Sequence, residues 1–250
     1  MSETPPSVPL PPHAPLARYY SDESERRRRV ASWFDASAAD YDWINSVLSF
    51  GSGNRYRRTA LLRHGLAPGM RTLDVACGTG VLAAYCQRVV GQDGLALGLD
   101  PSLGMLLQAE GRGVSRLIRS IAEGLPFADA SFDLLTMGYA LRHVADLRLV
   151  FREYRRVLRP GGKAVVLEIT APESAFARWL TRLYFRGFVP LVARLGQGGR
   201  SSRELMQYYW DTIDACVRPE EILQALRDAG FSRVGRHRLL GLFSEYWAIA

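Results

Sequence analysis

One short stretch of the chain joins an acidic residue to a glycine turn: Asp74-Val75-Ala76-Cys77-Gly78-Thr79-Gly80. It follows an apolar run typical of a strand and precedes an apolar segment, residues 81–90, typical of a helix. A second acid, Asp100, ends the next apolar run, about 20 residues further on. In open α/β sheets this arrangement holds an adenosine-containing ligand, and the second acid binds the ribose hydroxyls.

Asp74 bears on which adenosine ligand this is. The spacing Gly78-x-Gly80-x-x-Ala83 also fits a dinucleotide fingerprint. A pyrophosphate on the helix N-terminus would then lie near the Asp74 carboxylate, and like charges about 4 Å apart repel by roughly 1 kcal/mol in water. S-adenosylmethionine instead carries an ammonium and a sulfonium, which an acid helps to hold. We therefore expect S-adenosylmethionine, with NAD or a purely structural turn as the alternatives.

The composition is typical of a globular protein with one large core. The chain has 250 residues, 48% of them hydrophobic, and no apolar run reaches the roughly 18 residues that span a bilayer. We see no signal peptide, and three scattered cysteines indicate neither disulfides nor a metal site, so we expect a cytoplasmic protein without a metal. The net charge of +7 rests almost wholly on arginine, which indicates either a compositional preference or a basic surface for an anionic partner.

The elements that must position these residues alternate along the chain. This rhythm predicts βαβ units, and hence a doubly wound, mostly parallel seven-stranded sheet of the Rossmann-like kind. Arg159-Pro160-Gly161-Gly162 predicts a stop and turn before the fifth strand. The last two strands predict an antiparallel C-terminal hairpin. The expected strands are 70–75, 94–99, 115–121, 132–138, 163–169, 231–239 and 242–249, and the expected helices lie near 80–90, 102–110, 146–158, 202–214 and 219–229.

The regions outside this rhythm predict a tail, a cap and a lid. Residues 1–20 are expected to form a disordered proline-rich tail. Residues 21–68 would form an N-terminal helical cap, with one helix from Asp22 to Phe34 and two short helices further on. The run Arg26-Arg27-Arg28-Arg29 is expected to be a solvated helix face in preference to a binding site. Residues 69–250 would form the Rossmann-like domain, with a helical lid insertion at 172–214.

The order of motifs resembles that of class I S-adenosylmethionine-dependent methyltransferases. More narrowly, it is similar to the ubiquinone/menaquinone biosynthesis C-methyltransferases, from about Trp33 to the C-terminus. The residues that carry the resemblance are Tyr41-Asp42-x-Ile44-Asn45 with Ser49-Phe50-Gly51, Leu73 to Gly80, Ala122-Glu123-Gly124-Leu125-Pro126-Phe127, Leu141-Arg142-His143-Val144, and Val157-Leu158-Arg159-Pro160-Gly161-Gly162.

The resemblance implies S-adenosylmethionine as cofactor and methylation of a ring carbon of a quinol or related phenolic acceptor. It places Asp74, Gly78 and Gly80 at the methionyl part of the cofactor, Asp100 at the ribose and the Ala122 backbone at the adenine. We add further residues to the site: Ala76, Pro101 and Glu123 around the cofactor, and Tyr41, Asn45, Tyr208 and Tyr209 as walls of the substrate pocket.

Three functional alternatives stay open. One is O- or N-methylation of a soluble aromatic metabolite. Another is a catalytically inert subunit that only binds the cofactor, and a third is a dehydrogenase. A nucleic-acid methyltransferase is not expected, because residues 137–140 read Met-Gly-Tyr-Ala where such enzymes carry an Asn/Asp-Pro-Pro-aromatic motif.

Three positions depart from the resembled pattern and bear on proton transfer and adenine binding. The chain has Ile121 and Val81 where Asp is usual, and His143 where Asn is usual. His143 follows the fourth strand, at the edge where ligands bind, and its ordinary pKa near 6.5 suits a general base. Arg142 would stabilise the phenolate or hold a carboxylate of the acceptor. The alternative is that His143 caps a helix or only packs.

The expected lid has an apolar and a basic side. Apolar residues recur at helical spacing between 179 and 184, and Arg178, Arg182 and Arg186 do the same. Such a segment suits either an anionic membrane surface or a cover over the pocket. We therefore expect a protein that is either free in the cytoplasm or peripheral on the inner face of the membrane, with no nucleic-acid partner and an open oligomeric state.

Overall fold

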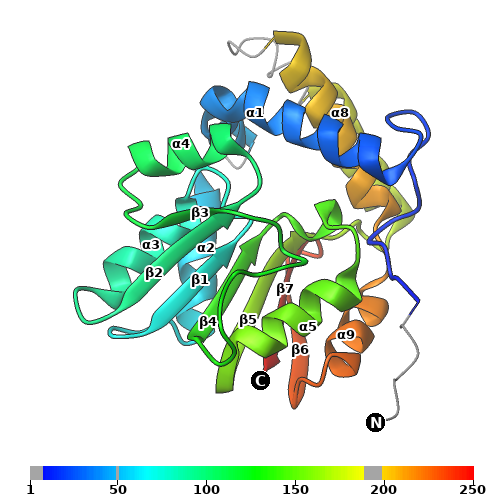
Figure 1. Ribbon diagram of the computed structural model, residues 1–250. Helices are drawn as coiled ribbons and strands as arrows, with labels where there is room; N and C mark the ends of the chain where they lie inside the picture. The colour runs from blue at the N-terminus through cyan, green and yellow to red at the C-terminus, as the bar shows by residue number, and fades with distance from the viewer. Residues whose placement is uncertain (1–7, 49–50, 189–198) are drawn as a thin grey trace.

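A seven-stranded sheet of order β3-β2-β1-β4-β5-β7-β6 forms the centre of the protein, which a computed structural model describes for residues 8–48, 51–188 and 199–250 (Figure 1). The strands are β1 Arg71–Val75, β2 Leu95–Asp100, β3 Leu117–Arg119, β4 Phe132–Gly138, β5 Leu158–Ile169, β6 Arg233–Leu239 and β7 Phe243–Ile249. The first five strands are parallel, and β7 runs antiparallel to β5 and β6. The predicted fold class, with its C-terminal hairpin, is confirmed.

Helices cover both faces of the sheet and its upper edge. They are α1 Glu23–Leu48, α2 Ser52–Arg63, α3 Val81–Val90, α4 Leu103–Gly111, η1 Leu141–His143, α5 Leu147–Val157, α6 Ala175–Leu183, η2 Tyr184–Phe188, α8 Gly199–Ala215 and α9 Pro219–Asp228. In Figure 1, α5 and α9 lie in front of the sheet and α2 and α3 behind it. α1 and α8 lie above the edge at which the parallel strands end.

The N-terminal helix is longer than predicted. One continuous helix of 26 residues replaces the expected helix ending at Phe34 and the first of the two short helices. The alanine-rich run after Phe34 favours helix. The Ser37 hydroxyl donates to the Trp33 carbonyl at 2.7 Å, so this residue also continues the helix with its polar group satisfied.

The fifth strand starts earlier than predicted and contains a bulge. Leu158 pairs with Phe132 and Lys163 with Leu134, so residues 159–162 are accommodated as an irregularity within β5. Gly161 has a φ of +79°, which glycine adopts without strain. The prediction of a stop and turn before the strand is therefore wrong: residues 159–162 form a bulge inside β5, which is already paired at Leu158.

α1 packs on α8 through an aromatic cluster above the sheet. Trp33 of α1 lies 5.2 Å from Tyr208 of α8, centroid to centroid, and Tyr19 contacts both rings. Phe185 of η2 stacks on Trp210 at 5.7 Å. α2, in contrast, buries residues 60 and 61 against α3 and the sheet. The domain boundaries at residues 20, 68, 172 and 214 stay a prediction, but this packing groups α1 with η2 and α8.

Residues 8–20 are ordered against the body of the protein, contrary to the prediction of a disordered tail. The Leu10 amide donates to the Asp146 carboxylate at 3.0 Å, and the Leu10 carbonyl accepts from Leu147 N at 2.9 Å. The Pro12 carbonyl accepts from Val217 N at 2.7 Å. The prolines hold an extended strap whose backbone is satisfied by remote residues. The rest of the predicted tail, residues 1–7, lies outside the described residues.

Among the residues described, no helix is both long and apolar enough to cross a bilayer.

Candidate active site

A cavity of about 550 Å³ lies at the carboxyl ends of β1, β2 and β4, under α1. Its walls come from the glycine turn, the ends of these strands, the loop after β3 and the inner face of α1. Two non-glycine residues at the strand ends have positive φ angles, Ala76 at 53° and Tyr139 at 61°. Backbone held in this region concentrates at binding sites, which supports the cavity as the functional one.

Asp74 is a buried acid at the floor of this cavity. Its two carboxylate oxygens accept from Thr136 Oγ1 at 2.7 Å and from Ala83 N, in the first turn of α3, at 3.1 Å. Burial raises the pKa of Asp74 to about 7, although these hydrogen bonds oppose the shift. The free protein thus holds a carboxylate at the cavity floor that a cationic ligand would help to ionise.

Asp100 shapes the turn as well as the cavity. Its carboxylate accepts from Gly78 N and from Ser102 N, both at 2.8 Å. Burial raises its pKa to about 6. Pro101, next to it, also lines the cavity. The second acid therefore lies across from Asp74 at the same strand edge, as the spacing predicts.

The two motif glycines have different surroundings. Gly78 lines the cavity, and its φ of +54° favours glycine. A Cβ on Gly80 would lie 2.8 Å from the Ala109 side chain, so this glycine permits close packing of α4 on the turn. Gly80 is not among the described residues that line the cavity, which places it behind the turn and away from the predicted contact with the cofactor.

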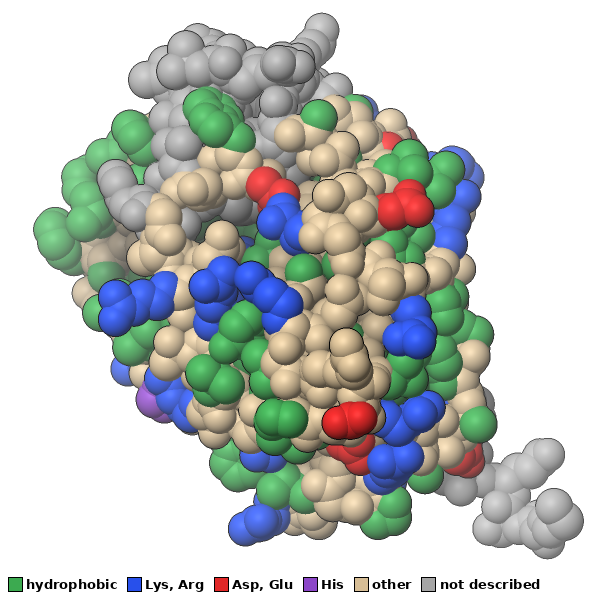
Figure 2. Space-filling model, turned by 90° about the vertical axis from the view of Figure 1, so that its left-hand side faces the viewer, with side chains coloured by type: hydrophobic (Ala, Val, Ile, Leu, Met, Phe, Trp, Pro, Cys, Tyr) green, Lys and Arg blue, Asp and Glu red, His purple; other side chains and the backbone are tan. Residues whose placement is uncertain are grey.

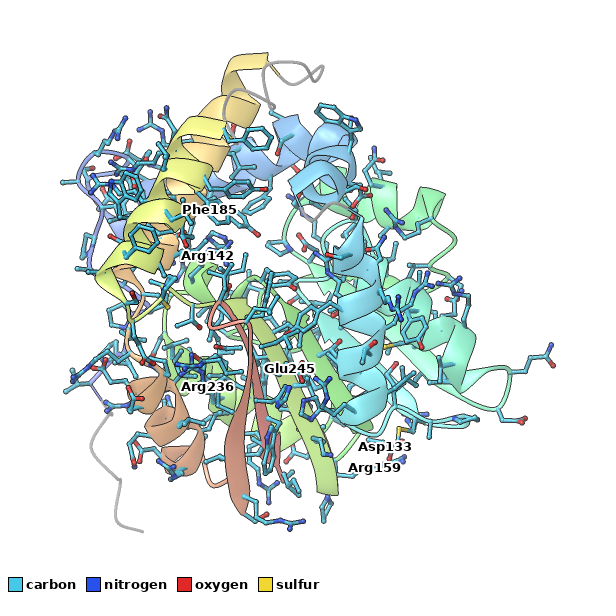
Figure 3. All side chains as sticks on the ribbon, turned by 180° about the vertical axis from the view of Figure 1, so that it is seen from behind. Asp133, Arg142, Arg159, Phe185, Arg236 and Glu245 are labelled. Atoms are coloured by element: carbon cyan, nitrogen blue, oxygen red, sulfur yellow. The ribbon has the colours of Figure 1, made fainter. Side chains whose placement is uncertain are left out.

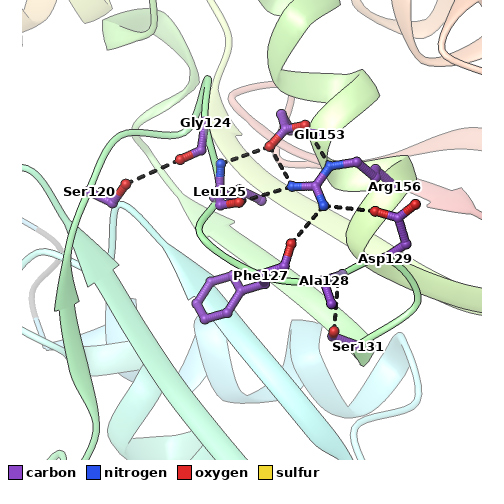
Figure 4. A network of polar contacts seen from close by, with 9 residues as sticks. All are labelled: Ser120, Gly124, Leu125, Phe127, Ala128, Asp129, Ser131, Glu153 and Arg156. Atoms are coloured by element: carbon purple, nitrogen blue, oxygen red, sulfur yellow. Dashed lines mark hydrogen bonds and ion pairs between the residues drawn. The ribbon is translucent and has the colours of Figure 1, made fainter.

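The loop after β3 carries Ala122 and Glu123 to the cavity wall. Arg156 of α5 holds the continuation of this loop: it donates to the carbonyls of Leu125 and Phe127 and pairs with Glu153 (Figure 4). Glu123 accepts from Ala145 N at 2.6 Å and so joins this loop to the segment after His143. Its position at the wall agrees with the sequence, but its carboxylate is engaged in holding backbone.

Two carboxylates of α1 fasten the helix across the cavity. Asp42 accepts from Thr79 Oγ1 at 2.7 Å and forms an ion pair with Arg112. About two helical turns earlier in α1, Asp35 accepts from Ser102 Oγ at 2.5 Å and from Gly104 N at 3.0 Å. The sequence analysis missed these contacts, because a helix-borne acid carries no sign of its remote partner.

His143 lies where the cavity meets the aromatic cluster. Phe34 of α1 meets its ring edge-on at 5.4 Å, and Tyr208 of α8 stacks on it at 5.6 Å. Both ring nitrogens are shielded from solvent and have no hydrogen-bond partner in the described part of the chain. Burial, reinforced by the positive charge of Arg142, lowers the pKa of His143 well below its ordinary value of 6.5. The ring is neutral and free to accept a hydrogen bond from a ligand.

Arg142 does not lie where a phenolate stabiliser must lie. Its side chain is fully buried, forms an ion pair with Glu168 and donates from Nε to Thr212 Oγ1 at 3.1 Å. Its guanidinium also lies 3.9 Å from the centroid of Tyr209. Figure 3 shows it at the end of the sheet over which α8 lies. Arg142 thus ties η1 to β5 and α8, and the predicted catalytic role is corrected to a positioning one.

Four residues were predicted to form the substrate pocket. The structure describes the side chains of two of them, and neither lines the cavity. Tyr208 and Tyr209 lie in the aromatic cluster behind His143 and do not line the cavity. The side chains of Tyr41 and Asn45, both in α1, lie outside the described residues. The described residues of the expected lid, 172–188 and 199–214, do not line the cavity either. α1 is the element that covers it.

Arg26 is a cavity residue that the sequence analysis assigned to a solvated face. It is 6% exposed and donates to the carbonyls of His143 at 2.9 Å and Val144 at 3.1 Å. Arg26, Val30 and Phe34 all line the cavity and are four residues apart. That helical spacing was the available signal: the run of four arginines contains one member on the apolar face of α1.

Comparison with known proteins agrees with this geometry. Residues 21–249 match the sequence profile of the ubiE/COQ5 methyltransferase family. The demethylmenaquinone methyltransferase of Geobacillus kaustophilus is 36% identical over 220 residues, which cover 85% of this chain and 91% of the relative. The ubiquinone/menaquinone biosynthesis C-methyltransferase UbiE of Azotobacter vinelandii is 34% identical over 226 residues and 88% of each chain.

Solved structures share the fold. An S-adenosylmethionine-dependent methyltransferase of Thermotoga maritima superposes with a TM-score of 0.62 at 20% identity, over 87% of this chain and 98% of that one. Phosphoethanolamine N-methyltransferase 2 of Haemonchus contortus, in complex with S-adenosylmethionine, gives 0.61 at 15% identity, over 86% of this chain and 57% of that one.

Proposed function

Because this chain belongs to the ubiE/COQ5 methyltransferase family, we propose that it methylates a ring carbon of a quinol or a related phenolic acceptor, with S-adenosylmethionine as the methyl donor. The family and the cofactor rest on the profile match and the relatives. The acceptor is inferred from the relatives' substrates. The observation that carries this inference is the make-up of the cavity: two buried acids lie at one end, and aromatic residues with an unpartnered histidine lie at the other.

The acidic end fits the cofactor's charges. S-adenosylmethionine, when bound, supplies a methyl group on a positively charged sulfonium and also carries an ammonium. Asp74 and Asp100 are two buried acids with raised pKa values, and no arginine or lysine pairs with either among the described residues. A cationic ligand would offset the cost of ionising them. We assign Asp74 to the methionyl part, Asp100 to the ribose and the loop at Ala122 to the adenine.

The other end fits an aromatic acceptor. Phe34, Val30 and Val144 give apolar walls, and the ring nitrogens of His143 are the polar atoms there without a described partner. For carbon methylation, loss of the neighbouring hydroxyl proton makes the ring carbon nucleophilic. We assign His143 to accept that proton at a ring nitrogen. An anionic phenolate beside the imidazole would counter the lowering of its pKa, so transfer becomes favourable only with the acceptor in place.

α1 supplies the water exclusion that methyl transfer requires. The helix is held across the cavity by Asp35 and Asp42, and a closed site keeps donor and acceptor aligned. Arg26 binds the carbonyls of His143 and Val144, and Arg142 anchors its own segment to Glu168 of β5, so both support the position of the His143 ring. These residues position the reacting groups and do not take part in bond changes.

We further propose that α6 and η2 form the contact with a membrane in which a long-tailed acceptor resides. Phe176, Trp179, Leu180 and Leu183 are between 52% and 71% exposed, which is unusual for such large apolar side chains. Arg178 and Arg186 pair with Asp214 and Asp211 of α8, and the Arg182 side chain is exposed beside the apolar residues. Aromatic residues with flanking arginine are typical of a helix at a bilayer interface.

Mass spectrometry of the quinone and phenolic pool tests the acceptor class. Cells with the gene deleted should accumulate a species one methyl group lighter than the product in normal cells. Complementation with the wild-type chain should restore the product, and the Asp100→Ala variant should restore less. An unchanged quinone pool, with a change only in soluble phenols, would favour the alternative of O- or N-methylation. No change in either pool would favour an inert cofactor-binding subunit.

A further inference from the structure

A second hollow, of about 320 Å³, lies between α2 and α3. Among the residues that the structure describes, its lining contains Arg57, Arg58, Arg88 and Arg112 and no acidic residue. Figure 2 views the side of the molecule on which α3 lies, and blue basic side chains gather near the middle of this face. Arg112 pairs with Asp42, and the charge of Arg57 acts on the carboxyl of Asp74, but within the described ranges no carboxylate forms an ion pair with Arg58 or Arg88. Positive charge around a hollow without a protein counter-ion favours an anionic ligand.

The arginines of this hollow are held in place by neighbouring groups. Arg58 and Arg88 lie on Tyr85, with guanidinium carbons 5.5 and 5.8 Å from the ring centroid. Such cation–π contacts orient the guanidinium groups without neutralising them. The wall beside them is closed by Gln87, whose amide donates to the Gly113 carbonyl at 2.8 Å. The hollow is therefore a shaped site and differs from a set of independent surface arginines.

Arg57 connects the hollow with the methyl-transfer cavity. It lines both spaces, as do Asn54, Val81, Leu82 and Arg112. Its guanidinium carbon lies 4.9 Å from the ring centroid of Tyr139, and Nη1 donates to Asn54 Oδ1 at 3.4 Å. The proposed roles of the first cavity do not use Arg58, Arg88 or Tyr85. These residues are therefore available to a separate ligand.

We propose that the α2–α3 hollow binds a phosphate group, held by Arg57, Arg58 and Arg88, at a site distinct from that of methyl transfer. Three guanidinium groups around one space match the several acceptor oxygens of a phosphate, and arginine binds phosphate through paired N–H donors. The volume admits more than an inorganic ion, so the group belongs to a phosphorylated small molecule or to the headgroup of an anionic lipid. Both sources present the same chemistry to the arginines.

Calorimetric titration with pyrophosphate tests the site directly. The protein is first saturated with S-adenosylhomocysteine, so that pyrophosphate cannot enter the cofactor cavity. We expect saturable binding of one pyrophosphate that weakens as salt is raised. Arg58→Gln and Arg88→Gln should each weaken it by about tenfold, the effect of losing one charged hydrogen-bonding partner. Arg233→Gln, which removes an exposed arginine from the distant edge strand β6, should leave it unchanged. Unchanged thermal melting confirms that the variants fold.

A vesicle arm separates the two sources. Flotation with phosphatidylglycerol and with phosphatidylcholine vesicles is compared for the wild-type protein, the Arg58→Gln/Arg88→Gln protein and the Arg233→Gln protein. If the double variant loses pyrophosphate binding alone, the source is a soluble phosphate compound. If it loses phosphatidylglycerol binding alone, the source is a lipid headgroup. The proposal is overturned if the double variant changes neither, or if Arg233→Gln has the same effect as the double variant.

Discussion

Two buried acids line the cavity at the ends of β1 and β2, and our proposal assigns them to a positively charged ligand. In the free protein, burial raises the pKa of Asp74 to about 7 and that of Asp100 to about 6. Below these values the carboxyls are protonated, and a cation must displace a proton to bind with full strength. The cavity is thus matched to its ligand at neutral pH and mismatched in acid.

The affinity for the cofactor should therefore decrease as the pH is lowered. Between pH 7.5 and 5.5 we expect the affinity for S-adenosylmethionine to drop by about a hundredfold, because each protonated carboxyl must first ionise. Calorimetry across this range checks the effect, and Asp74→Asn should remove most of the slope above pH 6. A wild-type affinity that stays constant from pH 7.5 to 5.5 would contradict the assignment of Asp74.

The same shift makes a linked prediction for stability. A carboxyl whose pKa is raised by folding stabilises the folded state at low pH, and this contribution is lost as the pH rises from the ordinary value of 3.8 through the folded-state pKa, which is about 7 for Asp74 and about 6 for Asp100. Asp74→Asn should therefore raise the melting temperature of the cofactor-free protein at pH 8 and change it little at pH 4.5. This readout does not depend on catalysis.

His143 is predicted to move a proton without titrating in the usual range. His143→Ala should lower turnover by about 10²-fold or more, the typical effect of losing a general base, with cofactor affinity nearly unchanged. Because its pKa is well below 6.5, no inflection near pH 6.5 should come from this residue. His143→Asn keeps a hydrogen-bond acceptor but takes no proton, so we expect it to resemble His143→Ala. Full activity in His143→Asn would assign proton removal to water or another group.

At the scale of elements, α1 is the cover of the cavity, and two carboxylates fasten it. Asp42→Asn removes the charge that pairs with Arg112 but keeps the size of the side chain. We expect faster dissociation of S-adenosylhomocysteine and a higher KM for the cofactor, by about three- to tenfold, with a smaller change in kcat. Stopped-flow displacement measures the dissociation rate. Asp93→Asn, which changes an exposed carboxylate in the turn before β2, is the matched control. Equal effects of the two substitutions would show that the Asp42–Arg112 ion pair does not hold α1 over the cavity.

Local sequence was enough to predict the elements around the cofactor. The glycine turn, Asp100 and the alternation of strands and helices depend on neighbours within one βαβ unit, and each was confirmed in place. The acceptor end was predicted less well. Arg142 was assigned to the ligand because its sequence neighbours do not show its partners. Those partners are Glu168 of β5 and Thr212 of α8, both remote in the sequence. The side of α1 on which Arg26 lies could be predicted from its four-residue spacing with Val30 and Phe34, but its contacts with the carbonyls of residues 143 and 144 could not.

At the scale of the whole molecule, we propose that the exposed apolar residues of α6 contact a lipid surface, from which the acceptor enters the cavity under α1. Trp179→Ser with Leu180→Ser should reduce flotation with anionic vesicles several-fold, because two large apolar contacts with the interface are lost. Turnover on a short-chain soluble acceptor should not change. Flotation at low salt measures the first effect, and a turnover assay of the same double variant measures the second. Undiminished vesicle binding would assign the exposed face of α6 to another partner.

The site of methylation on the product is the most direct test of the central claim. S-adenosylmethionine labelled with ¹³C at its methyl group is incubated with the protein and a reduced, short-chain demethylated quinol, and the product is examined by ¹³C NMR. The account predicts a labelled methyl carbon bonded to an aromatic carbon, absent with heat-treated protein and strongly reduced with His143→Ala. A labelled methoxy carbon, or no labelled product from any phenolic acceptor while the cofactor binds, would contradict carbon methylation by this cavity.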